Sequence, residues 1–189
     1  MSNLDLYEAI RPSIKTGDMV AWHSDSLFPG RIIQWFSKSE FSHISIAVRF
    51  AEFDQDRVYI FEEVETGAVL MPLSKRLRGQ NGKAWLFPLA SDLLPIRAFM
   101  GAWCLSKLGT HYDYKGLLEN VGGRISVDAH AMICSEYGWM AFGYGCIHAH
   151  CGLNLLRQAT DKLKGKVPRP SDWPMLQKCG IFGKEEKIL

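Results

Sequence analysis

Cys134 and the two polar residues after it form the most chemically suggestive segment of this sequence. A cysteine becomes nucleophilic when a helix N-terminus or a neighbouring imidazole lowers its pKa. Apolar residues recur at helical spacing over 130–143, so Cys134 is expected near the start of a helix, where the macrodipole favours thiolate. Cys104 instead falls in the middle of a helical pattern over 94–108 and is predicted to be a core residue. Cys134 is therefore the candidate nucleophile.

His43 is the candidate base for such a thiol. It opens a segment, 43–50, that is rich in β-branched residues, so a strand would hold its backbone while the ring points to one face. A thiol site also needs a third group to orient the imidazole through its second nitrogen. Glu62 and Glu63 end the predicted partner strand, 58–64, but strand alternation places them on opposite faces and does not choose between them.

A second cluster, residues 146–151, holds two thiols and two imidazoles. Zinc ligands normally come from two chain segments, with two to five residues between paired ligands. The residues Cys146, His148, His150 and Cys151 are too crowded to close a tetrahedron alone. We therefore expect a glycine-flanked loop near the active site, with no metal and no cofactor. A metal-dependent protein built on these four residues is the alternative. No glycine-rich phosphate loop follows a strand.

The order of predicted elements indicates an α+β fold, in which an antiparallel sheet or partial barrel packs against helices and the nucleophile stands at a helix N-terminus. Residues 32–36 form a short helical or extended turn, and the proline-rich tail at 167–174 is expected to be irregular, with a fraying charged end. One domain is predicted over 1–189, with its core at about 16–175. The predicted strands are 19–22, 43–50, 58–64, 68–73 and 83–88, and the predicted helices are 94–108, 130–143 and 153–163.

Composition excludes several other classes of protein. The 189 residues are 47% hydrophobic and 12% aromatic, enough for a core without metal or disulfide staples. A net charge of +2 argues against a nucleic-acid-binding surface. No apolar stretch reaches the roughly 18 to 20 residues needed to span a bilayer. With no signal peptide and an odd number of cysteines, we expect reduced thiols and a cytoplasmic protein, although a viral or non-classically released protein would look the same.

Several short motifs occur in a defined order along the chain. They are Gly17-Asp18-Met19-Val20, Ser42-His43-Ile44-Ser45, Tyr59-Ile60-Phe61-Glu62-Glu63-Val64, Tyr112-Asp113-Tyr114 and Cys134-Ser135-Glu136-Tyr137. The set resembles the NlpC-like papain-fold cysteine peptidases, except that the cysteine follows the histidine strand. That order is similar to the circularly permuted, YiiX-type branch, which includes relatives of lecithin:retinol acyltransferase.

This resemblance implies a permuted papain-like fold with Cys134 as nucleophile, His43 as general base and Glu62 as the orienting acid. It implies a thiol hydrolase that forms an acyl-enzyme on an amide, such as a cell-wall or other small peptide. The backbone N–H of Cys134 is expected to stabilise the oxyanion. A lipid thioesterase or acyltransferase, and a non-catalytic lipid- or peptide-binding module, are the alternatives.

Four further residues are expected to contact substrate: Tyr112, Asp113, Ser42 and Trp22. For Tyr112 and Asp113 a purely structural turn explains the motif equally well. The aromatic side chains of Trp22, Phe41, Trp85 and Trp139 are candidates to line an apolar acyl pocket, or equally to pack in the core. The oligomeric state is not predicted.

Overall fold

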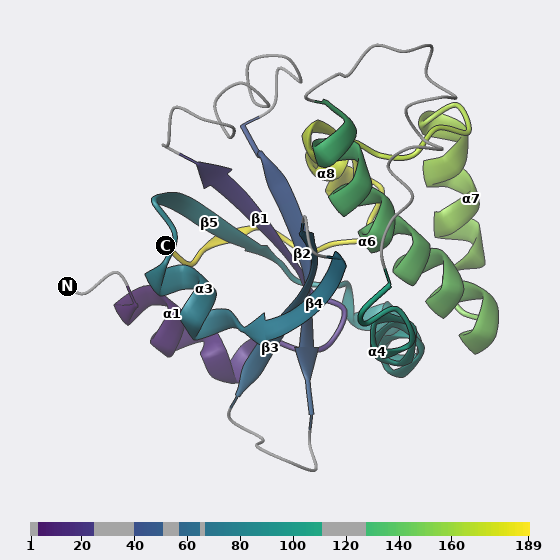
Figure 1. The fold of residues 1–189 in the computed structure, drawn as a ribbon. Coiled ribbons are helices and arrows are strands. Elements are labelled where there is room, and N and C mark those ends of the chain that lie inside the picture. The colour runs from purple at the N-terminus through teal and green to yellow at the C-terminus, as the bar shows by residue number, and fades with distance from the viewer. Residues whose placement is uncertain (1–3, 25–39, 51–56, 65–66, 111–127) are drawn as a thin grey trace.

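The computed structural model describes residues 4–24, 40–50, 57–64, 67–110 and 128–189. In these residues six strands form one antiparallel sheet in the order β4-β3-β2-β1-β5-β6 (Figure 1). The five strands predicted from the sequence are confirmed, and so is the hairpin of 43–50 with 58–64. The strands are β1 Met19–Ser24, β2 His43–Arg49, β3 Val58–Val64, β4 Gly67–Pro72, β5 Gly82–Phe87 and β6 Glu186–Lys187.

Helices cover the sheet from two sides, which makes the fold α+β as predicted. In Figure 1, α1 and α3 lie on one side of the sheet, and α4, α6 and α7 lie on the other. Among the described residues, no helix is both long enough and apolar enough to cross a bilayer. The α-helices are α1 Asp5–Ile10, α3 Leu73–Arg78, α4 Arg97–Ser106, α6 Asp128–Ala149, α7 Leu153–Lys162 and α8 Trp173–Lys178.

The strand β2 lies in the middle of the sheet and is buried on both faces. Its five inner residues are all buried. Ile44 and Ile46 belong to the apolar cluster beneath α4 and α6, whereas Ala47 belongs to the cluster beneath α1 and α3. The partial alternation of apolar residues over 43–50 predicts a strand buried on one face only. That prediction is wrong, because helices cover both faces of the sheet at β2.

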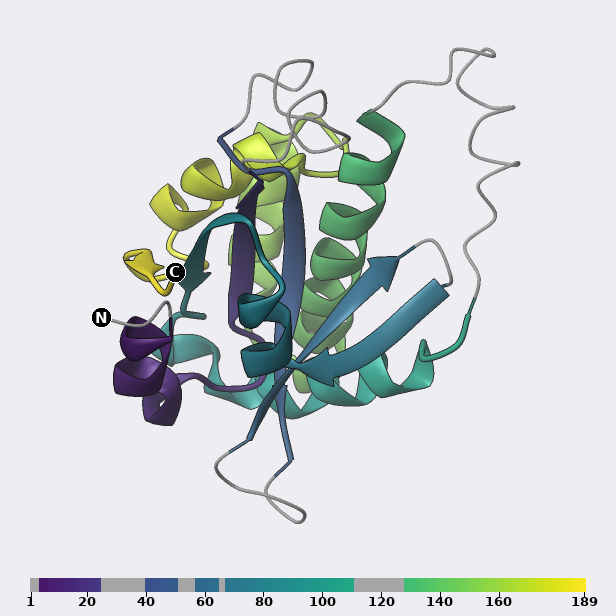
Figure 2. The same cartoon turned by 60° about the vertical axis from the view of Figure 1, so that its left-hand side comes forward.

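The sheet is strongly twisted. Figure 2 shows β3 and β4 running across the direction of β1 and β5. Right-handed twist accumulates from strand to strand in any open sheet. The helix α3 follows β4 directly, and its Leu73 and Leu77 share an apolar cluster with Val20 and Trp22 of β1.

The helix that carries Cys134 begins earlier than the sequence pattern indicated. It starts at Asp128 and continues to Ala149, so Cys134 is its seventh residue and not part of its first turn. The segment 146–149 is its last turn, so the expected glycine-flanked loop there was also wrong. Helical apolar spacing shows which face is buried, but it marks helix ends poorly when no capping residue is present.

The predicted helix at 94–108 divides into two parts. A 3₁₀ helix runs from Ser91 to Ile96 and includes Pro95, and α4 follows it directly. Proline at this place removes a backbone donor and cannot continue a regular α-helix on its N-terminal side. The prediction at 153–163 is confirmed as α7, and the short element expected at 32–36 lies outside the described residues.

The C-terminal segment is ordered, which corrects the expectation of an irregular and fraying tail. A 3₁₀ turn at Pro170–Asp172 leads into α8, and β6 pairs with β5. Ile188 and Leu189 are buried among the side chains of α1, α3 and β1. Burial of these two apolar residues holds the charged segment before them in place.

Candidate active site

Sheet register brings polar residues of β2 and β3 together. Ile46 pairs with Phe61, and antiparallel pairing then places Ser45 opposite Glu62. The Ser45 hydroxyl donates to Glu62 Oε2 at 3.0 Å. His43, two residues before Ser45, follows the same alternation and reaches the same carboxylate.

The His43 ring and the Glu62 carboxylate form an ion pair. Nε2 of His43 lies 2.9 Å from Oε2 of Glu62, and the two side chains are 20% and 2% exposed. Because one ring nitrogen is held by the carboxylate, the other is free to face a reacting group. Glu62 is the residue that the family resemblance implied. Glu63 lies on the opposite face of the strand and is not part of this ion pair.

A second cation holds the other oxygen of Glu62. Nε of Arg76, on α3, donates to Oε1 at 3.2 Å. Burial alone raises the pKa of Glu62, but His43, Arg76 and Ser45 together lower it from 4.5 to about 2. Glu62 is therefore a carboxylate at every physiological pH, although it is almost completely buried.

Cys134 reaches the site from α6, which packs against β2. Its side chain is buried and hydrogen-bonds to His43. Burial lowers the pKa of His43, but the Cys134 charge and hydrogen bond, followed by those of Glu62, raise it from 6.5 to about 10. The structure thus brings Cys134, His43 and Glu62 into one cluster, in the order thiol, imidazole, carboxylate.

The expected oxyanion donor needs correction. Only the first four N–H groups of an α-helix lack an intrahelical acceptor. As the seventh residue of α6, Cys134 lies beyond them, and the macrodipole acts mainly within the first turn. The chemical environment of the Cys134 thiol is therefore set by His43 and not by a helix N-terminus.

Trp22 was predicted to contact substrate, but it does not line a substrate pocket. Its side chain instead supports the site from within the core. It is 1% exposed, and its indole N–H donates to Ser45 Oγ at 2.7 Å. The guanidinium of Arg76 lies over its ring, 4.6 Å from the centroid. Trp22 therefore fixes Ser45 and Arg76, the two residues that hold Glu62.

The other predicted substrate contacts have different outcomes. Ser42 is 8% exposed and donates to the backbone carbonyl of Trp22 at 3.0 Å, which ties the start of β2 to β1. Its hydroxyl therefore makes a hydrogen bond within the protein, in place of the predicted contact with substrate. Tyr112 and Asp113 lie outside the described residues, so their role stays a prediction.

Three of the aromatic residues proposed for an acyl pocket pack against other rings. Phe41 lies edge-on to Trp85, with centroids 5.3 Å apart. Trp139 stacks on Phe142 at 5.5 Å. Phe41 is 6% exposed. Core packing, the alternative reading of these residues, accounts for their contacts.

Two residues of the site, Arg76 and Ser45, were not predicted from the sequence. Ser45 could have been found, because a residue two positions after His43 on a strand shares its face. Leu73 and Leu77, four residues apart, are the only sign of the short helix that carries Arg76. A six-residue helix has too few apolar positions to be recognised by periodicity, and nothing local indicates which acid its arginine meets.

The cysteine and histidine residues of 146–151 do not gather as metal ligands. The described residues contain no group of three or more His, Cys, Asp or Glu side chains suited to hold a metal ion. Cys146 is fully buried in the apolar cluster, and burial raises the pKa of its thiol to about 12. The His148 ring packs on Tyr144, with centroids 4.0 Å apart. The Cys151 thiol donates to the carbonyl of Asp92 at 3.5 Å.

These residues form the C-terminal cap of α6. Cys151 N–H donates to the carbonyl of Cys146 and His150 N–H to that of Ile147, which is the Schellman pattern. His150 adopts the left-handed conformation this cap requires, with φ of 49°. The cluster therefore ends a helix, and its two thiols take the positions at which a Schellman motif usually makes an apolar contact.

Comparison with known proteins shows a likeness to solved structures. No family model matches the chain, and no curated protein matches it. Among solved structures, the chain resembles the metalloprotein YiiX from Escherichia coli O157:H7, with a TM-score of 0.53 over 93% of this chain and 96% of that chain. At 19% sequence identity, this likeness shows a shared α+β fold. The described residues of this chain do not form a group suited to a metal centre.

Proposed function

We propose that this protein is a thiol hydrolase that cleaves an amide bond through an acyl-enzyme on Cys134. The observation that carries the proposal is the single hydrogen-bonded cluster of Cys134, His43 and Glu62. Covalent acyl transfer needs a nucleophile, a base and a group that orients the base, each within reach of the next.

The first half-reaction begins from a thiolate–imidazolium pair. Sγ of Cys134 attacks the carbonyl carbon, and the C=O electrons move to oxygen. When the tetrahedral intermediate collapses, the C–N bond breaks, and His43 gives its proton to the departing amine. The products are a thioester on Cys134, a free amine and a neutral His43.

The second half-reaction needs His43 to act as a base, and the electrostatics of the site support this change of role. Apart from burial, the Cys134 charge is the largest influence on His43, and it raises the pKa of the ring. Acylation removes that charge, so the pKa of His43 falls. The neutral ring then accepts a proton from water as the hydroxide adds to the thioester carbonyl. When this second tetrahedral intermediate collapses, the C–S bond breaks, the carboxylic acid leaves, and the thiolate of Cys134 and the imidazolium of His43 are restored.

Glu62, Arg76 and Ser45 serve as positioning residues in this scheme. Glu62 holds Nε2 of His43 and compensates its positive charge in a buried place. Arg76 donates to Oε1 and Ser45 to Oε2 of the carboxylate, so both oxygens are held and rotation of Glu62 away from the ring is opposed. A buried charge that is held on every side in this way is stable and correctly oriented.

The preferred substrate is a small peptide or other amide, because an amine is a poor leaving group until it is protonated. An imidazolium with a pKa of about 10 still carries its proton at neutral pH and can supply it. Ester and thioester substrates share the same acyl-enzyme step, so a lipid thioesterase or acyltransferase is the second outcome of the test.

Selective alkylation tests the nucleophile. Iodoacetamide at pH 6 should modify Cys134 faster than Cys179, which is half-buried and has no imidazole partner among its described contacts, and faster than Cys104, whose thiol pKa burial raises. Peptide mapping by mass spectrometry gives the three rates. Equal rates at Cys134 and Cys179 would remove the activated thiolate from the proposal.

Trapping of an acyl group tests the reaction itself. The protein is incubated with matched amide, ester and thioester libraries that carry the same acyl groups, and intact mass shows any adduct. Turnover and adduct should be lost in Cys134→Ala and kept in Cys179→Ala. If Cys134→Ala hydrolyses all three libraries at the wild-type rate, the proposed function is wrong.

A further inference from the structure

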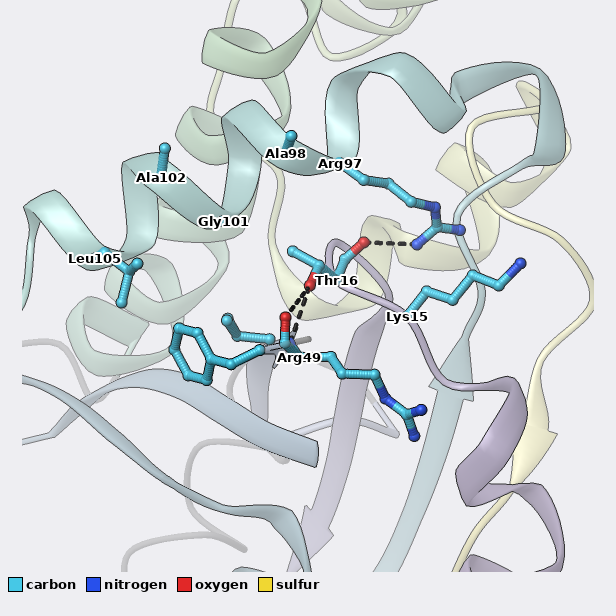
Figure 3. A pocket seen from close by; sticks show the side chains of 10 residues that line it. Lys15, Thr16, Arg49, Arg97, Ala98, Gly101, Ala102 and Leu105 are labelled. Carbon is cyan, nitrogen blue, oxygen red and sulfur yellow. Dashed lines mark hydrogen bonds between the residues drawn. The ribbon is translucent and has the colours of Figure 1, made fainter. Parts of the chain in front are cut away.

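A groove lies far from the proposed active site, between the end of β2 and α4. Its cavity volume is about 520 Å³. Val48, Arg49 and Phe50 line it from the sheet, and Ala98, Ala102 and Leu105 line it from α4 (Figure 3). His43 and Arg49 are the two ends of β2, so the groove and the active site are about 20 Å apart along that strand.

The hollow exists because one face of α4 carries small side chains. Ala98, Gly101 and Ala102 recur at helical spacing toward the groove. A Cβ at Gly101 would lie 3.0 Å from Cγ2 of Thr16, so α4 approaches the turn before β1 closely at this point. Thr16 is held in turn by Arg49, whose N–H donates to its hydroxyl at 2.9 Å. The walls of the groove are therefore fixed by contacts between α4, the turn before β1 and the end of β2.

Charge is distributed unevenly along the groove. In Figure 3 the side chains of Lys15, Arg49 and Arg97 extend toward one end, and Leu105 lies toward the other. No aspartate or glutamate is among the lining residues. Arg97 pairs with Asp18 at 2.7 Å, so two cations, Lys15 and Arg49, are left without an ion pair within the described part of the chain.

Within the described residues, Arg49 also keeps unused hydrogen-bonding capacity. One of its terminal nitrogens donates to the carbonyl of Arg11 at 2.6 Å, and its buried Nε has no acceptor among the described atoms. A guanidinium carries five N–H donors. A carboxylate that approached this end of the groove would therefore meet the positive charge of Lys15 and Arg49.

We propose that this groove binds a long-chain fatty carboxylate, with its acid group beside Lys15 and Arg49 and its chain along Phe50, Ala102 and Leu105. The cavity volume falls within the usual 300–1,000 Å³ of small-molecule sites, which are mostly apolar and contain a few placed polar groups. A ligand with one anionic end and one apolar chain matches the uneven distribution of charge and apolar surface.

Fluorescence titration with 11-(dansylamino)undecanoic acid tests the proposal. The wild-type protein should bind the probe saturably at one site and bind its methyl ester more weakly. Ala102→Phe fills the groove from an exposed helix position and should weaken binding at least about tenfold. Gln158→Phe adds the same ring to the exposed face of α7 and should leave binding unchanged.

Charge reversal tests the placement of the acid group. Lys15→Glu should weaken acid binding roughly fivefold, while Lys162→Glu, on α7, should not. Equal binding by wild type and Ala102→Phe, or equal affinity for the acid and its ester, would overturn the proposal. Cys134→Ala should bind the probe like the wild type, so the result is independent of the proposed hydrolase activity.

Discussion

Replacement of Glu62 by glutamine tests whether this carboxylate controls His43. The amide keeps the size of the side chain and removes its charge. In the wild-type protein the pKa of His43 is raised to about 10, with Glu62 contributing after Cys134. We expect the His43 pKa to fall in Glu62→Gln, and the Cys134 thiolate to lose part of its stabilisation.

The expected size follows from the single contact that is changed. A hydrogen bond to a charged group contributes about 1.5–3 kcal/mol. One pKa unit corresponds to about 1.4 kcal/mol, so the pKa of His43 should fall by about one to two units. If the thiolate loses the same stabilisation, alkylation of Cys134 at pH 6 should slow by roughly ten- to a hundredfold.

Nuclear magnetic resonance of the histidine side chains measures the pKa of His43 directly. The His43 resonance is assigned by its loss in His43→Gln, and its titration is followed from pH 5 to 11 in both proteins. Glu63→Gln is the matched control, since Glu63 is the neighbouring buried acid on the opposite face of β3. The titration curve of His43 in Glu63→Gln should match that in the wild type.

Two results would refute the reasoning. A wild-type His43 that titrates near its ordinary value of 6.5 would show that the ion pair with Glu62 and Cys134 does not form. An unchanged His43 titration in Glu62→Gln, or a shift of equal size in Glu63→Gln, would show that Glu62 is not the orienting residue.

Three further predictions concern the support of the site and the cap of α7. Arg76→Ala should slow alkylation of Cys134 at pH 6 by about tenfold, and Arg76→Lys should restore part of it; if both variants lose stability alone, with an unchanged pH profile of alkylation, Arg76 is merely structural. Because its pKa is lowered to about 2, Glu62 stabilises the fold above pH 4.5 and loses this effect as the pH falls toward 2. Urea unfolding should therefore show the wild type losing about 2 kcal/mol more than Glu62→Gln between pH 5.5 and 3, and parallel losses would contradict the lowered pKa. Gly152→Ala should lower the free energy of unfolding by about 1–3 kcal/mol more than Gly165→Ala. Both glycines have positive φ, but only at Gly152 would a Cβ meet another side chain, at 2.6 Å; equal losses would show that packing there relaxes freely.

The strands and the order of the reactive residues could be read from the sequence. β-Branched runs separated by turn residues marked β1 to β5, because strand formation depends on local patterns of burial. Cys134 and His43 stood out by residue type and position. The choice of Glu62 over Glu63 came only from the family resemblance, since alternation assigns them to opposite faces without saying which face holds the histidine.

The partners of Glu62 were decided by tertiary structure. Arg76 reaches it because β4 turns directly into α3 and the twist of the sheet carries that helix over Trp22. Trp22 looked like a pocket wall from its residue type, but its position in β1 buries it under that arginine. No local pattern encodes such contacts, because they depend on strand register and on the path of the chain in three dimensions. The start of α6 was likewise missed, and with it the reason that an imidazole, rather than a helix N-terminus, acts on Cys134: the first turn of that helix lies six residues earlier in the chain.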